Sequence, residues 1–259
     1  MTHPKIASEI KIAARLLENA RHLIVFSGAG ISTPSGIPDF RGEKEGLWQR
    51  LDPMQVASAT SFFKTPNVFY DWFRPLFMTS WMAQPNPAHL AIAELEQMGL
   101  VHAVITQNID GLHQKARSQK VIELHGTAMQ FFCPACRLRC EAAKVFSDFN
   151  KGIEVPVCVN CGNIIKPEVV LFEEALPQKA WNQAVNEARQ ADILLIVGSS
   201  LEVHPAASIP QYTLDNGGKV LINNLSVTPL DQQALMVLHI DAAEFFPLLM
   251  KEISPTKQY

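Results

Sequence analysis

Four cysteines in two close pairs carry the most specific chemistry in this sequence. Cys133 is paired with Cys136 and Cys158 with Cys161, with two residues between the members of each pair. A two-residue spacer lets one tight turn direct both sulfurs at one ion, and two such turns complete a tetrahedral site of four thiolates. Because four cysteines leave no open coordination position, the pattern favours one structural Zn²⁺ ion over a catalytic one. A redox dithiol and two chance pairs are the alternatives, and the fifth cysteine, Cys140, is expected to be dispensable for the site.

A glycine-rich turn follows the first apolar run of the sequence. Residues 23–26 read as a buried strand, and Gly28, Ala29 and Gly30 come just after it. Glycines at such a turn let the backbone approach a phosphate, and the start of the following helix supplies N–H groups. Thr33 occupies the position of the third glycine in a dinucleotide-binding fingerprint, so this turn taken alone is only a weak indication of a nucleotide site.

Three further strand ends carry side chains that suit a ribose or a phosphate. Two amides and a carboxylate follow one strand, and small hydroxyl and amide groups follow two later strands. These residues are Gln107, Asn108, Asp110, Ser199, Ser200, Asn223 and Asn224. Each of them could be ordinary loop capping. Their shared position at the ends of predicted strands nevertheless favours a nucleotide site, because ligands of open α/β sheets bind beyond the carboxyl ends of the strands.

A histidine occupies one more strand end. His125 is followed by Gly126, and the cysteine pairs come shortly after it. A lone histidine is usually structural or exposed to solvent, but this position favours a place in a cleft between two lobes. A neutral imidazole there can act as a general base.

Apolar runs and helical patterns alternate along the rest of the chain. Residues 6–21 have helical periodicity, and a second helix is marked by Asn86 as its cap, Pro87 as its first residue and Gly99 after its end. Further helices are expected near 178–189, 206–215 and 242–251, and strands at 101–106, 121–124, 193–197, 220–222 and 237–240. Repeated strand–helix units with fully apolar strands predict an α/β fold, in which helices cover both faces of a parallel sheet.

Two stretches interrupt this alternation. Residues 36–85 are rich in aromatics and are interpreted as a small helical lobe, while residues 129–165 contain the cysteine pairs. The large α/β domain is then expected to comprise residues 1–35, 86–128 and 166–259. Inserts of this kind leave a cleft between a large and a small lobe, which loops after strands should line.

Composition argues against several classes of function. The 259 residues are 47% hydrophobic, enough for a large core, and the net charge of −3 offers no basic field to a nucleic acid. The N-terminal residues lack the apolar core of a signal peptide, and no stretch reaches the roughly 18 apolar residues of a membrane span. Cysteines used as metal ligands fit a reducing compartment. We therefore expect a cytoplasmic protein without nucleic-acid or membrane partners.

Taken together and in this order, the motifs resemble those of the sirtuins, a family of NAD⁺-dependent protein-lysine deacylases. The resemblance covers about residues 20–246 and rests, besides the two cysteine pairs, on Gly28–Ser32, Gly36–Arg41, Thr106–Asp110, His125–Gly126 and Gly198–Leu201. It implies a Rossmann-type large domain, a small domain made of a zinc ribbon and a helical insert, and a cleft that takes NAD⁺ and an acyl-lysine peptide from opposite sides. The implied products are free lysine, nicotinamide and 2′-O-acyl-ADP-ribose.

The resemblance also implies a role for each matching residue. His125 would be the general base, and Gln107 and Asn108 would position the ribose and an ordered water. Ile109 and Asp110 would line the nicotinamide pocket. The other residues would cover the nicotinamide site or hold the pyrophosphate, its ribose and the adenosine half; they are Gly28, Ala29, Gly30, Thr33, Asp39, Phe40, Arg41, Gly198, Ser199, Ser200, Asn224, Leu225, Asp241 and Ala242.

Residues 166–173 match the substrate-binding segment of the family, to which the peptide adds as a strand between the lobes. The resemblance implies that Val170, Leu171 and Phe172 contact the substrate, with Val170 at the acyl-lysine. Glu173 stands where the family usually has glycine, so the approach of the peptide backbone is expected to differ here.

The expected acyl group follows from two apolar positions. Sirtuins that prefer succinyl or malonyl groups carry a tyrosine and an arginine three residues apart in the helical lobe, and alignment on Pro66 places Phe73 and Leu76 there. Neither side chain offers a cation to a carboxylate. Acetyl and longer neutral acyl groups are therefore expected to be preferred over succinyl.

Three other functions remain open. The same NAD⁺ chemistry could mono-ADP-ribosylate proteins, although the intact His125 and substrate segment favour deacylation. A nonenzymatic zinc-ribbon binding module would predict a basic face, which the net charge of −3 does not favour. A hydride-transferring dehydrogenase is disfavoured by the incomplete glycine fingerprint.

Overall fold

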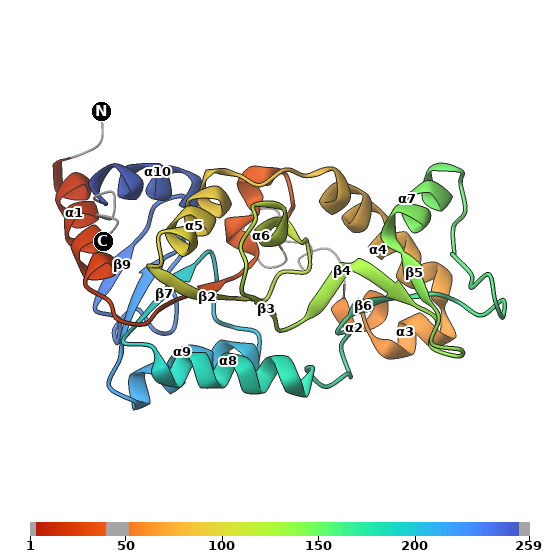
Figure 1. Ribbon diagram of the computed structural model, residues 1–259. Helices are drawn as coiled ribbons and strands as arrows, with labels where there is room; N and C mark the ends of the chain where they lie inside the picture. The colour runs from red at the N-terminus through yellow and green to blue at the C-terminus, as the bar shows by residue number, and fades with distance from the viewer. Residues whose placement is uncertain (1–3, 40–51, 254–259) are drawn as a thin grey trace.

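A six-stranded parallel sheet forms the larger part of the molecule. The computed structural model describes residues 4–39 and 52–253, and the strands of this sheet follow the order β3-β2-β1-β7-β8-β9 (Figure 1). The strands are β1 (Leu23–Ser27), β2 (Val101–Thr106), β3 (Val121–Glu123), β7 (Ile193–Val197), β8 (Lys219–Asn223) and β9 (Met236–Leu238). Every neighbouring pair is parallel, as the sequence predicts. The order reverses between β1 and β7, and such a reversal is where open α/β sheets bind ligands.

Helices cover both faces of this sheet. On one face lie α1 (Pro4–Glu18), α5 (Pro87–Gln97) and α10 (Ala242–Glu252), and on the other α8 (Gln178–Gln190) and α9 (Ile209–Asp215). Successive residues of β1 alternate between the two cores: Val25 packs in the first, and Ile24 and Phe26 in the second. Burial on both faces explains why the first four residues of the strand are apolar.

A second, three-stranded sheet belongs to the smaller lobe. It has the order β5-β4-β6 and is antiparallel, with β4 (Gly126–Phe132), β5 (Arg139–Glu141) and β6 (Lys166–Val169). The helices α2 (Pro53–Val56), α3 (Ala59–Lys64), α4 (Pro66–Met82) and α7 (Ala142–Asn150) complete the lobe. Phe69, Phe73 and Phe77 of α4 pack in one core with Phe131 and Phe149. The aromatic residues thus form a helical core, as expected, and they share it with the cysteine-containing segment.

Several expected elements differ in their bounds. The helix expected at 206–215 starts as the 3₁₀ turn η4 (Ala206–Ser208), and the strand expected at 237–240 is β9, which ends at Leu238. The cap of α5 is confirmed, since the Asn86 side chain accepts the N–H of Ala88, and Gly99 has a φ of +75° just after the helix. The short helix α6 (Leu112–Lys115) and α7 were not predicted.

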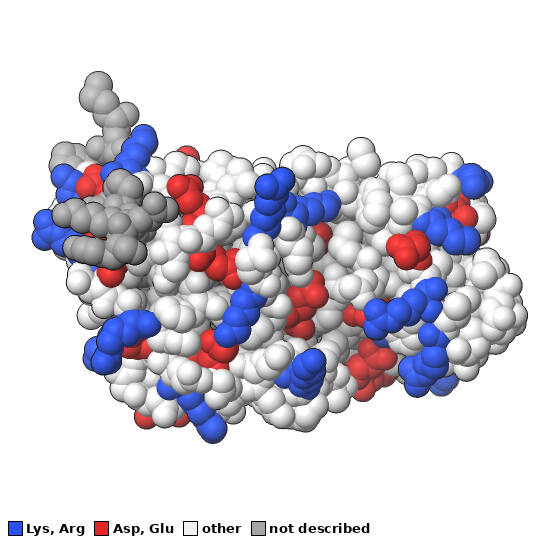
Figure 2. All heavy atoms as spheres, viewed as in Figure 1, with Lys and Arg blue, Asp and Glu red and all other residues white. Residues whose placement is uncertain are grey.

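Charges of both signs are interspersed on the surface. Figure 2 shows Lys and Arg side chains beside Asp and Glu across one face of the molecule, without an extended field of one sign. Within residues 4–39 and 52–253, none of the helices is both long and apolar enough to cross a membrane.

Candidate functional site

The loops after β1 and β7 pack against each other at the carboxyl end of the sheet. Gly28 and Gly30 donate their N–H groups to the carbonyls of Val197 and Gly198, at 3.0 and 2.8 Å. A Cβ added to Gly28 would lie 2.8 Å from the Gly198 carbonyl oxygen, and one added to Gly30 would lie 2.9 Å from the same atom. The sequence suggested that these glycines let the backbone approach a phosphate. The structure shows that the absence of a Cβ at both positions makes room for the loop after β7.

The chain after Gly28 forms two 3₁₀ turns, where the sequence suggested a helix start. These turns are η1 (Ala29–Ile31) and η2 (Thr33–Ser35), and the Thr33 hydroxyl donates to the Gly30 carbonyl at 3.1 Å. Asp39 is the last residue described before residue 52. Phe40 and Arg41, which were predicted to contact the cofactor, lie outside the described residues.

The loop after β2 buries a carboxylate and an amide. Asp110 is 5% exposed and accepts hydrogen bonds from the Ser32 hydroxyl at 2.7 Å and from the Leu112 N–H at 2.8 Å. The Asn108 amide donates to the Gly28 carbonyl at 3.1 Å and to the Ser32 hydroxyl at 3.2 Å. Burial raises the pKa of Asp110 above its ordinary value, although the two hydrogen bonds and the charge of Lys115 oppose this. The loops after β1 and β2 are thereby joined around Asp110.

Two buried histidines lie beneath this loop, and the sequence reasoning missed both. The rings of His89 and His113 lie 4.9 Å apart, and His113 Nε2 is 2.9 Å from the Ser27 hydroxyl. Burial lowers the pKa of His89 to about 4 and that of His113 well below its ordinary value, so both rings are neutral at pH 7. Neither residue has a local sequence pattern that sets it apart from an exposed histidine.

His125 follows β3 and connects two parts of the site. Its Nδ1 lies 2.9 Å from the Gln107 carbonyl, which can only accept, so the hydrogen is on Nδ1 and Nε2 is the basic nitrogen. The His125 carbonyl accepts the N–H of Val170 at 2.9 Å. Burial lowers the pKa of His125, and the hydrogen bond to Gln107 offsets part of this. The imidazole is therefore neutral at physiological pH.

Residues after β7, β8 and β9 complete the row of polar groups at the carboxyl end of the sheet. The Gln107 amide donates to the Ser199 hydroxyl at 2.8 Å, which ties the second loop to the third. Asn224 is buried, whereas the neighbouring Leu225 is 63% exposed. Asp241 caps α10 by accepting the N–H of Ala243 at 2.7 Å, and Ala242 begins the helix. The residues expected to hold an adenosine thus lie along the ends of β7, β8 and β9.

The expected substrate segment runs between His125 and the helical lobe. β6 pairs with β4, and after Val170 the N–H of Phe172 donates to the Ala57 carbonyl at 3.0 Å. The Phe172 carbonyl in turn accepts the N–H of Ala59 at 3.0 Å. Leu171 is buried. The segment is therefore held at both ends by backbone hydrogen bonds.

The four paired cysteines form a zinc site. The sulfurs of Cys133, Cys136, Cys158 and Cys161 all lie within 4.8 Å of one another. Two of the sulfur–sulfur distances are 3.5 and 3.6 Å, close to the roughly 3.8 Å edge of a tetrahedron with Zn–S bonds of about 2.3 Å. Each pair is closed by a turn, in which Arg137 donates to the Cys133 carbonyl and Gly162 to the Cys158 carbonyl, both at 2.8 Å. Cys140 is outside the cluster, as expected.

Comparisons with known proteins agree on one family. The Sir2 family model matches residues 28–205. The NAD-dependent protein deacylase 2 of Archaeoglobus fulgidus is 46% identical over 246 residues, which are 95% of this chain and 96% of that protein. A solved structure of Sir2 with a p53 peptide and NAD⁺ superimposes with a TM-score of 0.86 at 40% identity, covering 94% of this chain and 98% of the other. A structure of Sir2Tm with a propionylated peptide superimposes with a TM-score of 0.85 at 38% identity, covering 95% and 100%.

Proposed function

The chain belongs to the Sir2 family, and we propose that it is an NAD⁺-dependent protein-lysine deacylase. The observation that carries the proposal is the setting of His125. The partly buried, neutral imidazole of His125 is hydrogen-bonded to the Gln107 carbonyl, and the backbone carbonyl of His125 accepts the N–H of Val170 in the substrate segment. The relatives named as deacylases and the structures with acyl peptides support the same assignment.

The residues at the carboxyl ends of the strands suit NAD⁺. Bound NAD⁺ supplies a sugar carbon from which nicotinamide can leave and to which an acyl oxygen can bond. Asp110 accepts from the carboxamide beside Ile109, and Gln107 and Asn108 orient the ribose. The loops after β1, β7, β8 and β9 hold the pyrophosphate and the adenosine half. Weaker placement of nicotinamide in Asp110→Asn should reduce turnover and nicotinamide inhibition together.

His125 accepts a proton at Nε2 from a ribose hydroxyl. The Gln107 carbonyl fixes the tautomer, because it holds the hydrogen on Nδ1. Since burial lowers the pKa of the ring, Nε2 is unprotonated at neutral pH and ready to accept. The backbone link to Val170 keeps this base beside the acyl-lysine.

The helical lobe favours neutral acyl groups. Phe73 is fully buried and stacks on Phe69 and Phe77, and Leu76 packs against Ile37 and Ile109. A succinyl carboxylate beside these side chains would lose its hydration without a cation in return, which costs several kcal/mol for a buried ion. Arg74 does not supply that cation, since it pairs with Asp71 at 3.0 Å on the same helix.

Mass spectrometry of one lysine peptide tests the activity. Acetyl, decanoyl and succinyl forms are incubated with the protein, with and without NAD⁺. We expect NAD⁺-dependent loss of acetyl and decanoyl, slow loss of succinyl, and one acyl-ADP-ribose per deacylated lysine. An ADP-ribose adduct on protein would instead identify a mono-ADP-ribosyltransferase, and faster loss of succinyl would overturn the assignment of Phe73 and Leu76.

The zinc ion stabilises the smaller lobe. Cys133 is buried in the core that the cysteine segment shares with α4, so losing the metal should destabilise both. We expect Cys133→Ser to contain less than one zinc per chain and to melt at a lower temperature. Cys140→Ser is the matched control and should keep both zinc and stability; zinc loss in that variant would mean that the ligand set is wrong.

We further propose a cytoplasmic location and a division into three parts. Thiolate ligands require reduced cysteines, and all five cysteines are free of disulfides. Residues 1–35, 86–128 and 166–259 supply the NAD⁺-binding domain, with 36–85 and 129–165 as inserts.

A further inference from the structure

Glu173 has a backbone conformation that side chains rarely adopt. Its φ is +75°, in the left-handed region that favours glycine, and the residue is exposed. A glycine at this position would be free of that strain. Strained backbone conformations cluster at functional sites. The strain therefore points to a role for the Glu173 side chain that a glycine could not fill.

The carboxylate of Glu173 is fixed in place by the helical lobe. Its Oε2 accepts the N–H of Thr60 in the first turn of α3 at 2.9 Å. The neighbouring backbone is tied to the same turn, because Ala59 donates its N–H to the Phe172 carbonyl at 3.0 Å. The side chain is therefore anchored through one oxygen, although it lies at the surface.

The negative charge of Glu173 is not neutralised locally. The next residue, Glu174, forms an ion pair with Lys166 at 3.0 Å, and Lys166 is 5% exposed. Among the residues that the structure describes, Glu173 itself forms no ion pair within 4.0 Å. At the end of the substrate segment, residues 166–173, one carboxylate without an ion-pair partner among the described residues therefore faces solvent.

Glu173 is close to the place where the acyl-lysine must bind. Val170, three residues earlier, donates to the His125 carbonyl, and three residues of extended chain span at most roughly 10 Å. Neighbouring side chains on one face of a peptide strand are about 7 Å apart. The carboxylate is thus within reach of a peptide residue next or nearly next to the acyl-lysine.

We propose that Glu173 is a specificity-determining residue that selects acyl-lysine peptides with a basic residue at one flanking position. The inference rests on the proposed deacylase function and deepens it. The fixed carboxylate attracts Lys or Arg at the position that it faces and repels Asp or Glu there. Because the anchoring to α3 holds the charge in one place, the preference is confined to one or two neighbouring positions of the peptide.

A pair of substitutions separates this role from simple helix capping. Glu173→Gln keeps an oxygen that accepts the Thr60 N–H but removes the charge. Glu173→Gly removes both the accepting oxygen and the charge, and it also removes the backbone strain. Glu252→Gln removes the same charge from the end of α10, in the large lobe away from β6 and α3, and serves as the control (Figure 1).

The test uses acetyl-lysine peptides that carry a single Arg or a single Glu at each flanking position in turn. Fluorescence anisotropy gives Kd without NAD⁺, and deacetylation gives kcat/KM. For wild type and Glu252→Gln we expect Arg to be preferred over Glu by about two- to five-fold at one or two adjacent positions, the range for exposed ion pairs, and less at high salt. In Glu173→Gln and Glu173→Gly the ratio should fall to about one.

Three results would overturn the proposal: no preference in wild type, a preference that survives in Glu173→Gln, or an equal preference at every position. The last result would assign the selection to net charge alone. If the wild type showed the binding preference without NAD⁺-dependent deacetylation, the inference would stand and the proposed activity would fail.

Discussion

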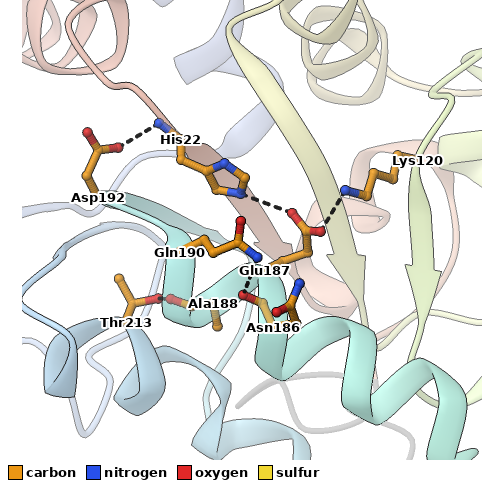
Figure 3. A network of polar contacts seen from close by, with 8 residues as sticks. All are labelled: His22, Lys120, Asn186, Glu187, Ala188, Gln190, Asp192 and Thr213. Atoms are coloured by element: carbon orange, nitrogen blue, oxygen red, sulfur yellow. Dashed lines mark hydrogen bonds and ion pairs between the residues drawn. The ribbon is translucent and has the colours of Figure 1, made fainter.

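The two ends of the large sheet both bury ionisable side chains, but among the residues that the structure describes only the amino end holds a buried carboxylate in ion pairs. At the amino ends of the strands, Glu187 of α8 accepts from Lys120 at 2.6 Å and lies 3.0 Å from His22 Nε2 (Figure 3). At the carboxyl ends, Asp110 accepts from two neutral donors, the Ser32 hydroxyl and the Leu112 N–H. The same chemical group is thus held in two different electrostatic environments.

The pKa values of the two carboxyls move in opposite directions. Burial alone would raise the pKa of Glu187, but the hydrogen bonds and charges of Lys120 and His22 bring it below its ordinary value. Burial dominates at Asp110 and raises its pKa. The charge of Lys115 opposes this rise, but burial has the larger effect. Buried groups with strongly perturbed pKa values cluster at functional sites. The amino end is therefore structural, while the carboxyl end is built for a ligand.

The histidines follow the same division. His22 has Glu187 as a partner, and its backbone N–H donates to Asp192 at 2.9 Å (Figure 3). At the other end, the Nδ1 atoms of His89 and His113 are buried and have no hydrogen-bond partner within the described residues. His22 therefore belongs to a partly buried polar network, whereas His89 and His113 each keep one ring nitrogen without a partner in the described part of the chain.

The largest expected effect is at the carboxyl end. His125→Ala should lower deacetylation by a factor of about 10²–10⁴, because it removes the general base. Its melting temperature and its Kd for NAD⁺, measured by calorimetry, should change little. His102→Ala, which removes an exposed ring at the amino end, is the control and should keep its activity. Turnover in His125→Ala at the wild-type rate would mean that another group takes the proton.

The second prediction addresses the amino end. Glu187→Gln should lower the free energy of unfolding by about 1–3 kcal/mol, since hydrogen bonds to a charged group are lost from a largely buried position. Its kcat/KM should stay within about two-fold of wild type. Denaturant titrations and steady-state kinetics measure both quantities, with Glu252→Gln as an exposed control. A loss of activity at unchanged stability would contradict the division between the two ends.

The sequence predicts best what local patterns determine. The helix α5 follows from Asn86, Pro87 and Gly99 because a cap, a first turn and a termination act within a few residues. The buried strands follow from short apolar runs such as Ile193–Val197. The zinc cluster follows from two fixed spacings, each of which a single turn can satisfy.

Long-range contacts are what the sequence leaves open. The Glu187 network joins residues that are 165 and 67 positions apart, and no local pattern marks them as partners. The three-residue strand β5 is too short to show a period. His89 and His113 become distinctive only through burial, which depends on how α5 and α6 pack. The residues of the candidate site could be named from motifs, but their electrostatic environment required the fold.

The smallest expected effect is a difference in how stability depends on pH. The raised pKa of Asp110 means that the folded state keeps this proton to a higher pH than the unfolded chain, whose carboxyl titrates near pH 3.9. The contribution of Asp110 to stability therefore decreases as pH rises from about 4 through its folded pKa. Asp110→Asn removes this term, so its unfolding free energy relative to wild type should increase with pH over that window.

Glu187 should show the opposite slope. Because its folded pKa is lowered, its contribution is present above the unfolded pKa of about 4.3 and is lost as pH falls through the folded value. The stability deficit of Glu187→Gln should therefore be full at pH 7 and shrink below about pH 4. Urea titrations of wild type and both variants at pH 3.5, 5 and 7 measure the two slopes. Parallel slopes for the two variants would show that the carboxylates at the two ends of the sheet are not held in opposite environments.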